Sequence, residues 1–521
     1  MNRSNAGYQY LHGQKIAIMS FTFFIYFLTS GTLLFAQSTY PEAKLSKEDL
    51  FAHLSYLASD ELMGRRTGQP GNDTAATYIS QFFKTHGLQG MGDDGSFFQT
   101  ISFEQTTIPR EGKLTFDGHT YTQGDDMMIL KGDPFDGKTQ IVYAGHGLVD
   151  QENQIDDYAG VQAEGKIVVV LPGSPDAQDP LTISRLAPVK RKLAAERGAV
   201  AVIEIYRLGF PWSFFKQYFS RGGLELASGQ DKDEFVSYGW IKEQSVGDLN
   251  SWIKTEEALS AAFEHSGARV DQLTSQNVIG LIEGTDPNLK NEYVILTGHY
   301  DHVGAGADGG GFYNEEDSIF NGARDNAMGT VAIMAAAKSI SQQPTRRSVL
   351  VIALTGEEVG LLGSKYYVEH PVVPLDQSIL NINTDGAGYN DTTVVSVIGH
   401  GRTGIDELIK DGANWAGLGI FPNPVPRQNL YDRSDNVSFA QKGVPAVNIS
   451  PGITEFDDAI QYYYHQVTDE ADTVSPSYLL QYAKSITRIT RLIADSDKTP
   501  FWTEGDKYEE AGKKLYKLES E

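Results

Sequence analysis

The chain has 521 residues and a formal net charge of −25, with 68 acidic side chains against 43 lysines and arginines. So large an excess of negative charge argues against binding the phosphate backbone of a nucleic acid. The absence of cysteine excludes disulfides, thiolate zinc ligands and cysteine nucleophiles. At this length two domains are expected, and any bound metal must be held by histidine and carboxylate side chains.

The first 36 residues have the pattern of a targeting segment. Arg3 and Lys15 precede residues 16–36, a run without any charged residue. The run predicts a signal peptide, residues 1–36, cleaved after Ala36; an uncleaved anchor is the alternative, since the run is just long enough to span a bilayer. Both interpretations imply that the rest of the chain is transported across a membrane. Without cysteine, a bacterial periplasm or exterior is expected, with no stable membrane insertion after cleavage.

The first half of the mature chain mixes helical and strand-like patterns. Residues 46–90 predict two helices, because leucines recur at helical spacing and the second stretch is amphipathic. Further on, apolar runs predict strands at 140–143, 166–171 and 199–203, and a charged stretch predicts a helix at 190–198. The aromatic-rich residues 210–240 predict either core packing or a flap over a substrate cleft.

From about residue 275 the pattern changes to a regular alternation of strands and helices. A helix is expected at 327–340, and continuous apolar runs predict strands at 278–282, 293–297, 348–355 and 378–382. Strands that are apolar on both faces and separated by helices are typical of a mostly parallel sheet covered by helices on both sides. The sequence therefore predicts an α/β fold, followed by a charged C-terminal tail at 499–521. The last 25 residues are helix-prone and predict a solvated terminal helix.

Side chains able to bind a metal follow these strands. In the segment GHYDH, His299 and Asp301 lie on the same side of an extended chain. The imidazole can then bind a metal while the carboxylate orients it. The same alternation predicts that His302 points elsewhere. The alternative for His299 is a purely structural, hydrogen-bonded histidine.

Two further segments supply carboxylates. In GARDNA, Asp325 stands just before a helix, where it is either a helix N-cap or a carboxylate shared by two metal ions. In TGEE, Glu357 and Glu358 follow the most hydrophobic strand of the chain. Neighbouring side chains diverge, so one can bind a metal while the other accepts a proton; a solvated turn is the alternative.

Asp385 in NTDG and His465 in YYYH complete the set. Each of these segments taken alone is more often structural than functional. All but the last follow an apolar strand, and ligands of open parallel sheets bind beyond the carboxyl ends of the strands. We therefore expect the side chains to converge at that edge of the sheet.

In their order and spacing, GHYDH, GARDNAMGT, TGEE, NTDG and YYYH resemble the zinc-dependent aminopeptidase family, which includes bacterial leucyl aminopeptidases, aminopeptidase Y and the glutamate carboxypeptidases. The resemblance covers most of the mature chain and begins with LASDELMGR at 57–65. It implies a zinc-exopeptidase (phosphorylase/hydrolase-like) α/β fold interrupted by a β-rich protease-associated domain. The implied parts are a catalytic domain at 37–128 and 269–498 and an insertion at 129–268.

The resemblance also implies a site for two zinc ions, with manganese or cobalt also compatible with nitrogen and oxygen ligands. Glu357 would be the general base, and Asp301 would orient His299. Asp325 would be shared between the two ions. The implied metal ligands are His299, Asp325, Glu358, Asp385 and His465.

The segment RSDN at 433–436 departs from the family, which often has His after Ser-Asp. The departure leaves the substrate preference open without affecting the metal ligands. Tyr431, Arg433 and Asp435 are candidates for the specificity pocket; a loop packed by a turn is the alternative.

These observations predict a secreted di-zinc exopeptidase, an aminopeptidase acting on peptides. A carboxypeptidase or dipeptidase of the same fold would need an arginine cluster for the substrate carboxylate. A glutaminyl cyclase would work with a single zinc, and a non-catalytic binding module would have lost its ligands. The presence of every implied ligand and of Glu357 favours the peptidase. The preferred substrate residue and the oligomeric state stay open.

Overall fold

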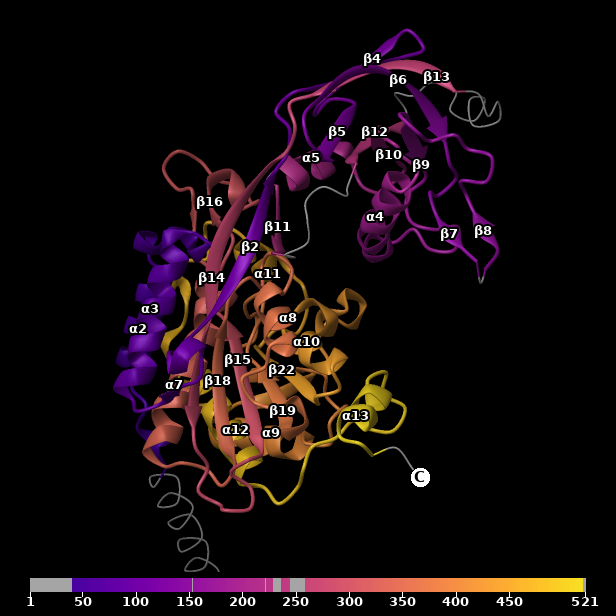
Figure 1. Ribbon diagram of the computed structural model, residues 1–521. Coiled ribbons are helices and arrows are strands. Elements are labelled where there is room, and N and C mark those ends of the chain that lie inside the picture. The colour runs from indigo at the N-terminus through magenta and orange to yellow at the C-terminus, as the bar shows by residue number, and fades with distance from the viewer. Residues whose placement is uncertain (1–39, 152, 221, 228–235, 244–257, 519–521) are drawn as a thin grey trace, which may run out of the picture. The chain divides into compact units, whose positions relative to one another are not determined.

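The computed structural model describes residues 40–151, 153–220, 222–227, 236–243 and 258–518. The predicted signal peptide lies outside the described residues. The chain forms two compact units: the first comprises residues up to Thr100 and from Gln276 onward, and the second is Ile101–Ser275. Strands β2 (Phe98–Thr107) and β14 (Arg269–Ile282) carry the chain from one unit to the other (Figure 1). Within the described ranges, no helix has the length and apolar character needed to cross a bilayer.

The first unit is built on a mixed sheet whose four central strands are parallel, as predicted. In spatial order they are β18 (Ser348–Leu354), β15 (Tyr293–His299), β19 (Ser378–Asn383) and β22 (Ala446–Pro451). On one side β14 pairs antiparallel with β18 and with the short β1 (Gln89–Gly90). On the other side β20 (Val394–Ile398) pairs antiparallel with β22 and parallel with β21 (Gly419–Pro422).

Helices cover both faces of this sheet (Figure 1). Successive side chains of a strand point to opposite faces, so Val294 and Leu296 join one apolar core while Ile295 joins another. The first core includes side chains of α2 (Lys47–Leu57), α3 (Pro70–Thr85), α7 (Met328–Gln342), α9 (Asp406–Trp415) and α12 (Pro476–Asp495). The second includes side chains of α8 (Leu362–Glu369) and α10 (Asn436–Gln441). The smaller elements are β16 (Gly304–Ala305), β17 (Ile319–Phe320) and α11 (Asp458–Tyr463).

The C-terminal segment differs from the solvated tail that its charge predicts. Trp502 is 3% exposed and belongs to the second apolar core. Its indole N–H donates to the carbonyl oxygen of Gly443 at 2.9 Å. The segment therefore packs on the first unit through its aromatic side chains, and only a short helix, α13 (Glu509–Leu515), follows.

The second unit contains an eight-stranded sheet in the order β4-β3-β13-β6-β9-β10-β12-β5. Its strands from β6 to β12 in this order are parallel to one another. The bounds are β3 (Gly112–Phe116), β4 (His119–Thr122), β5 (Met127–Lys131), β6 (Phe135–Tyr143), β9 (Ile167–Val170), β10 (Ala201–Tyr206), β12 (Ser237–Lys242) and β13 (Leu259–His265). Because β3, β4 and β5 belong to this sheet, the unit begins before the 129–268 predicted for the insertion.

Two helices, α4 (Pro180–Ala195) and α5 (Trp212–Ser220), accompany the sheet of the second unit. Aromatic rings from the sequence after residue 210 pack on one another: Trp212 stacks on Phe215, which contacts the edge of Trp240. The described part of that aromatic stretch thus contributes to packing, while residues 228–235 lie outside the described ranges. The remaining strands are β7 (Val149–Asp150), β8 (Ile155–Asp156) and β11 (Gly223–Leu226), which pairs with β2.

Candidate metal centre

The central strands of the first unit end at the same level. His299, the last residue of β15, is paired with Leu354, the last residue of β18. Thr297 is paired with Asn383, the last residue of β19. His299 and the loops that follow the two neighbouring strands therefore emerge at one edge of the sheet, which is the convergence that the sequence predicts.

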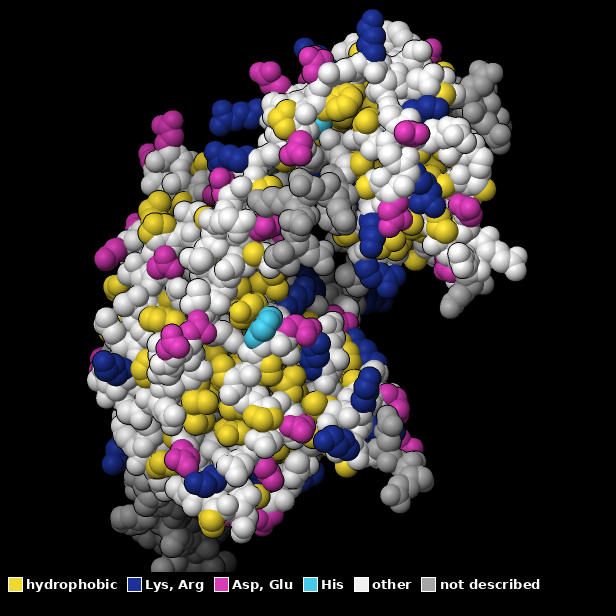
Figure 2. All heavy atoms as spheres, viewed as in Figure 1, with side chains coloured by type: hydrophobic (Ala, Val, Ile, Leu, Met, Phe, Trp, Pro, Cys, Tyr) yellow, Lys and Arg dark blue, Asp and Glu magenta, His cyan; other side chains and the backbone are white. Residues whose placement is uncertain are grey.

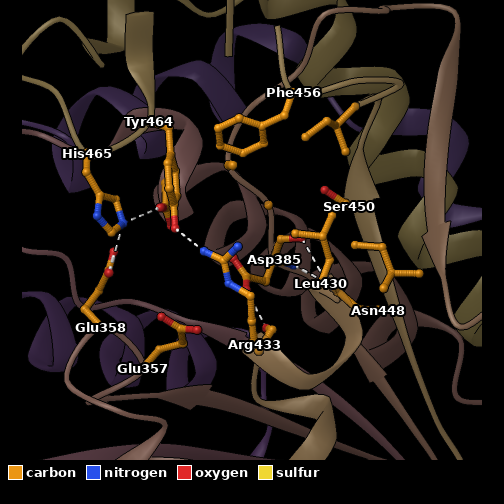
Figure 3. Close-up of a pocket in the computed structure, with 16 residues that line it drawn as sticks. Glu357, Glu358, Asp385, Leu430, Arg433, Asn448, Ser450, Phe456, Tyr464 and His465 are labelled. Carbon is orange, nitrogen blue, oxygen red and sulfur yellow. Dashed lines mark hydrogen bonds and ion pairs between the residues drawn. The ribbon is translucent and has the colours of Figure 1, made fainter. Parts of the chain in front are cut away.

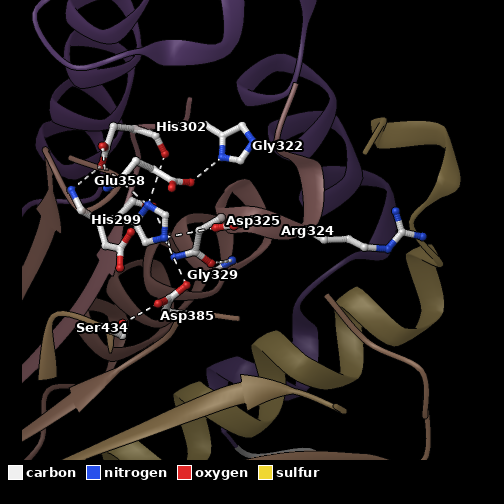
Figure 4. Close-up of polar contacts among 12 residues, drawn as sticks. His299, His302, Gly322, Arg324, Asp325, Gly329, Glu358, Asp385 and Ser434 are labelled. Atoms are coloured by element: carbon white, nitrogen blue, oxygen red, sulfur yellow. Dashed lines mark hydrogen bonds and ion pairs between the residues drawn. The ribbon is translucent and has the colours of Figure 1, made fainter. Parts of the chain in front are cut away.

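His299 is fully buried between two carboxylates (Figure 4). Its Nε2 lies 3.3 Å from Oδ1 of Asp325 and 3.1 Å from Oδ1 of Asp385. Its Nδ1 lies 3.2 Å from the backbone oxygen of Asp301, which can accept the ring proton and leave the Nε2 lone pair facing the carboxylates. Burial alone lowers the pKa of His299, but the carboxylates, Asp385 above all, raise it well above its ordinary value.

Asp325 is shared by two histidines. Nε2 of His465 lies 3.2 Å from Oδ2 of Asp325 and 3.1 Å from Oε2 of Glu358. Burial by itself lowers the pKa of His465, but these carboxylates raise it to about 10. Burial by itself raises the pKa of Glu358, but His465 and His302 lower it to about 2. The alternative role of Asp325 as a helix N-cap is not realised, because α7 has Ala327 at its N-cap.

His302 belongs to the same cluster, so the prediction that it points elsewhere is wrong. Its Nδ1 lies 2.7 Å from Oε1 of Glu358, and the side chain is buried. The alternation rule fails here because β15 ends at His299, and the residues after it are not extended strand. Donor atoms from His302, Asp325 and Glu358 lie within 4.8 Å of one another, as do those from His299, Glu357 and Asp385.

Asp301 acts mainly on the loop that carries the glutamates. Its carboxylate accepts the backbone N–H groups of Glu357 at 3.2 Å and Glu358 at 3.4 Å, and the hydroxyl of Thr67 at 3.0 Å. Its Oδ1 is farther, at 3.6 Å, from Nδ1 of His299. Asp301 thus positions both sides of the site.

Glu357 points into a pocket next to Glu358 (Figure 3). Burial raises the pKa of Glu357 well above its ordinary value, and the neighbouring carboxylates of Asp385 and Glu358 add to the effect. A carboxyl group with a raised pKa in a cleft is suited to accepting a proton and later returning it.

The structure adds supporting residues that the sequence patterns did not reveal. The hydroxyl of Ser434 donates to Oδ2 of Asp385, and the side-chain oxygen of Asn448 accepts the backbone N–H of the same aspartate at 3.1 Å. The carboxylate of Asp469 accepts the backbone N–H of Asp325 at 3.2 Å. Ser434 lies in the RSDN segment, which the sequence already indicated as part of the substrate site. Asn448 and Asp469 lie in no sequence pattern that indicates a site.

The three candidates for the specificity pocket have different surroundings. Arg433 lines the pocket. Tyr431 is buried, donates its hydroxyl to the carbonyl of Ala446 at 3.0 Å and stacks against the guanidinium of Arg402. Asp435 is fully buried, which raises its pKa to about 7. Of the three, only Arg433 is among the described residues that line the pocket.

The pocket encloses about 60 Å³. Acidic side chains and His465 form one side (Figure 3). The rest of the lining combines the apolar side chains of Ile398, Leu430, Ile453 and Phe456 with polar ones, among them Arg433, Ser434, Asn448 and Ser450.

The donor set fits divalent metal ions. All donors are nitrogen or oxygen, and the pocket lining holds four carboxylates, Asp325, Glu357, Glu358 and Asp385. Arg433 is the one lysine or arginine among the described lining residues. Buried carboxylates in such excess require cations, and imidazole with carboxylate suits zinc, with manganese and cobalt also compatible.

Residues 277–490 match the sequence profile of "Peptidase family M28". The matched range is 214 of the 521 residues and lies within the first unit. The matched range contains every ligand predicted from the sequence, from His299 to His465.

Proteins similar in sequence to this chain include aminopeptidases. Aminopeptidase YwaD of Bacillus subtilis is 27% identical over 230 residues, which is 44% of this chain and 46% of the relative. The probable leucine aminopeptidase 2 of Aspergillus fumigatus is 24% identical over 365 residues, 64% of this chain and 62% of the relative. Each alignment spans less than two thirds of the relative's length. The solved aminopeptidase from Aneurinibacillus sp. strain AM-1 has the same fold, with a TM-score of 0.59 and 23% identity over 88% of this chain and 96% of that one.

Proposed function

We propose that the protein is a zinc-dependent aminopeptidase that removes N-terminal residues from peptides. The observation that carries the proposal is Asp325, whose two carboxylate oxygens lie 3.3 and 3.2 Å from the Nε2 atoms of His299 and His465. A carboxylate placed in this way can be shared by two metal ions. The M28 match and the aminopeptidase relatives support the reaction class.

The proposed ligands fall into two groups that share Asp325. His299 and Asp385 complete one group, and Glu358 and His465 complete the other. Metal ions bound there would polarise the scissile carbonyl and lower the pKa of a water molecule.

The side chains around the ligands have separate tasks. Glu357 accepts a proton from the attacking water and returns it to the leaving amine, so that water is added across the broken C–N bond. Asp301 keeps Glu357 in place through the backbone N–H that it accepts. Ser434 fixes the orientation of Asp385. The apolar lining receives a substrate side chain.

A dipeptidase or carboxypeptidase is the second candidate, and one observation favours it. Arg433 lines the pocket and could bind a substrate carboxylate. It is a single arginine, whereas a carboxypeptidase would need an arginine cluster, so the aminopeptidase is preferred. We also propose that the protein acts after export, on the basis of residues 1–36.

The experiment is hydrolysis of a panel of aminoacyl p-nitroanilides by the protein as purified, after chelation, and after zinc is restored. We expect chelation to abolish activity and zinc to restore it. Glu357→Gln should lower kcat by about 10²–10⁴-fold, the usual contribution of a general acid–base group, with the zinc content unchanged.

Glu504→Gln, at an exposed glutamate, is the matched control and should keep full activity. Hydrolysis that resists chelation, or full activity of Glu357→Gln, would contradict the proposal.

A further inference from the structure

Arg433 is exposed at the pocket and has no ion-pair partner among the described residues. It is the last residue of a short 3₁₀ helix, Leu430–Arg433, and its guanidinium lies between Tyr464 and the acidic side of the pocket (Figure 3). Its Nη2 donates to the hydroxyl of Tyr464 at 3.4 Å, which is long for a hydrogen bond. Among the described residues, no carboxylate oxygen lies within 4.0 Å of the Arg433 guanidinium.

Several other arginines of the first unit are paired with carboxylates, whereas the buried Arg65 donates to backbone oxygens. Arg402 lies 2.6 Å from Asp506, and Arg347 lies 2.7 Å from Glu292. Since the chain has a net charge of −25, carboxylates are plentiful. Arg433 is itself exposed, so its guanidinium is available to a partner at the pocket.

The surroundings of Arg433 favour a carboxylate as its partner. The planar guanidinium can donate two parallel hydrogen bonds to one carboxylate. Leu430 and Phe456 line the same pocket and offer apolar surface to the rest of a substrate. Two divalent ions would balance the four carboxylates of the lining, and Arg433 would then leave the pocket with a net positive charge.

We infer that Arg433 determines specificity by binding a carboxylate of the substrate, so that the preferred substrates are peptides that carry a negative charge close to the scissile bond. This inference rests on the proposed peptidase function. Two kinds of substrate present the required group: peptides with an N-terminal Glu or Asp, and dipeptides with a free α-carboxylate.

The experiment compares charged substrates with neutral ones of the same shape. The first arm measures kcat/KM for glutamyl and glutaminyl p-nitroanilide, and the second for Leu-Gly and Leu-glycinamide. In one arm the wild-type enzyme should prefer the carboxylate by roughly 10- to 100-fold, the range of a charge-assisted hydrogen bond. The arm that shows the preference identifies the source of the carboxylate.

Variants then assign the preference to Arg433. In Arg433→Gln the ratio should fall to about one, while Arg433→Lys, which keeps the charge, should retain part of it. Arg427→Gln is the matched control, because Arg427 is exposed on the same loop and does not line the pocket. It should leave both ratios unchanged, and leucyl p-nitroanilide should remain a substrate of every variant.

Two results would overturn the inference: a wild-type ratio near one in both arms, or equal losses on all substrates in Arg433→Gln. The latter would mean that Arg433 acts on the reaction rather than on the substrate charge. Absence of any hydrolysis by the zinc-loaded wild type would instead refute the proposed function. If the wild type hydrolyses nothing, calorimetry can still measure the binding of glutamate and glutamine to zinc-loaded Glu357→Gln protein. Tighter binding of glutamate that is lost on adding Arg433→Gln would support the carboxylate site. Equal binding of the two ligands would refute it.

Discussion

Each unit of the molecule buries a cluster of charged side chains, and the two clusters differ in their balance. In the second unit Lys190 and Glu204, both 0% exposed, form an ion pair at 3.3 Å. The ammonium of Lys190 also donates to the carbonyl of Leu171 at 2.7 Å, and the hydroxyl of Tyr238 donates to Glu204 at 3.0 Å. Every charge of this cluster has a partner within the chain.

The cluster of the first unit is unbalanced. Four carboxylates line its pocket, and the three histidines in contact with them, His299, His302 and His465, balance at most three of these charges even when all are protonated. A balanced buried pair contributes to structure without a ligand, whereas an excess of buried carboxylates requires cations. Surface charge gives no such signal: Figure 2 shows acidic and basic side chains interspersed on the face that it draws.

Metal binding should produce the largest change in stability, because it neutralises the unbalanced cluster. Zinc at a thousand-fold excess over its Kd should stabilise the folded protein by about 4 kcal/mol per site. We therefore expect the thermal midpoint to fall after chelation and to recover with zinc, measured by calorimetry. In Asp325→Asn the recovery should be much smaller. An equal response of the variant would mean that zinc binds elsewhere.

Breaking the balanced cluster should cost nearly as much. Lys190→Met leaves Glu204 without its ion-pair partner and should destabilise the protein by about 3–5 kcal/mol, measured by urea unfolding of the full chain. The double variant Lys190→Met/Glu204→Gln should recover most of this loss and should hydrolyse peptides normally. If the single and double variants were equally destabilised, the pairing would not be the source of the effect.

Glu470 is a half-buried carboxylate with acidic neighbours, so it resembles the unbalanced cluster but is more accessible to solvent. Burial, together with the charges of Asp60 and Asp317, raises its pKa from 4.5 to about 7. A raised pKa means that the protonated form is favoured in the folded state. Its contribution to stability is complete below about pH 4.5 and is lost as the pH rises through about 7.

Glu470→Gln should therefore reduce the fall in thermal midpoint between pH 5 and pH 8. In free energy of unfolding, the effect of the substitution on this pH dependence should be about 1 kcal/mol or less, because solvent screens the Glu470 carboxylate. Glu504→Gln, at an exposed position, is the control and should show the same fall as the wild type. An unchanged fall in Glu470→Gln would show that other groups govern this pH range.

The amino-acid sequence alone determined the parallel sheet and the main residues of its carboxyl edge. Apolar runs that end in His299, TGEE and NTDG carry this information, because a strand buried on both faces and followed by polar side chains has a local signature. The pairing of these strands then brings His299, Glu357 and Asp385 together. Residues on loops were harder to predict. Ser434 and Arg433 are neighbours in the chain, yet Ser434 donates to a carboxylate of the site whereas Arg433 donates to the hydroxyl of Tyr464.

Only the tertiary structure decided the role of His302 and the balance of charge. The alternation of a strand predicted the wrong direction for His302, because the chain leaves the strand at His299. Lys190 and Glu204 are 14 positions apart in the sequence and gave no sign of pairing. Local patterns specify which segments form strands and helices, whereas the partner of a buried charge depends on contacts between segments that the fold alone brings together.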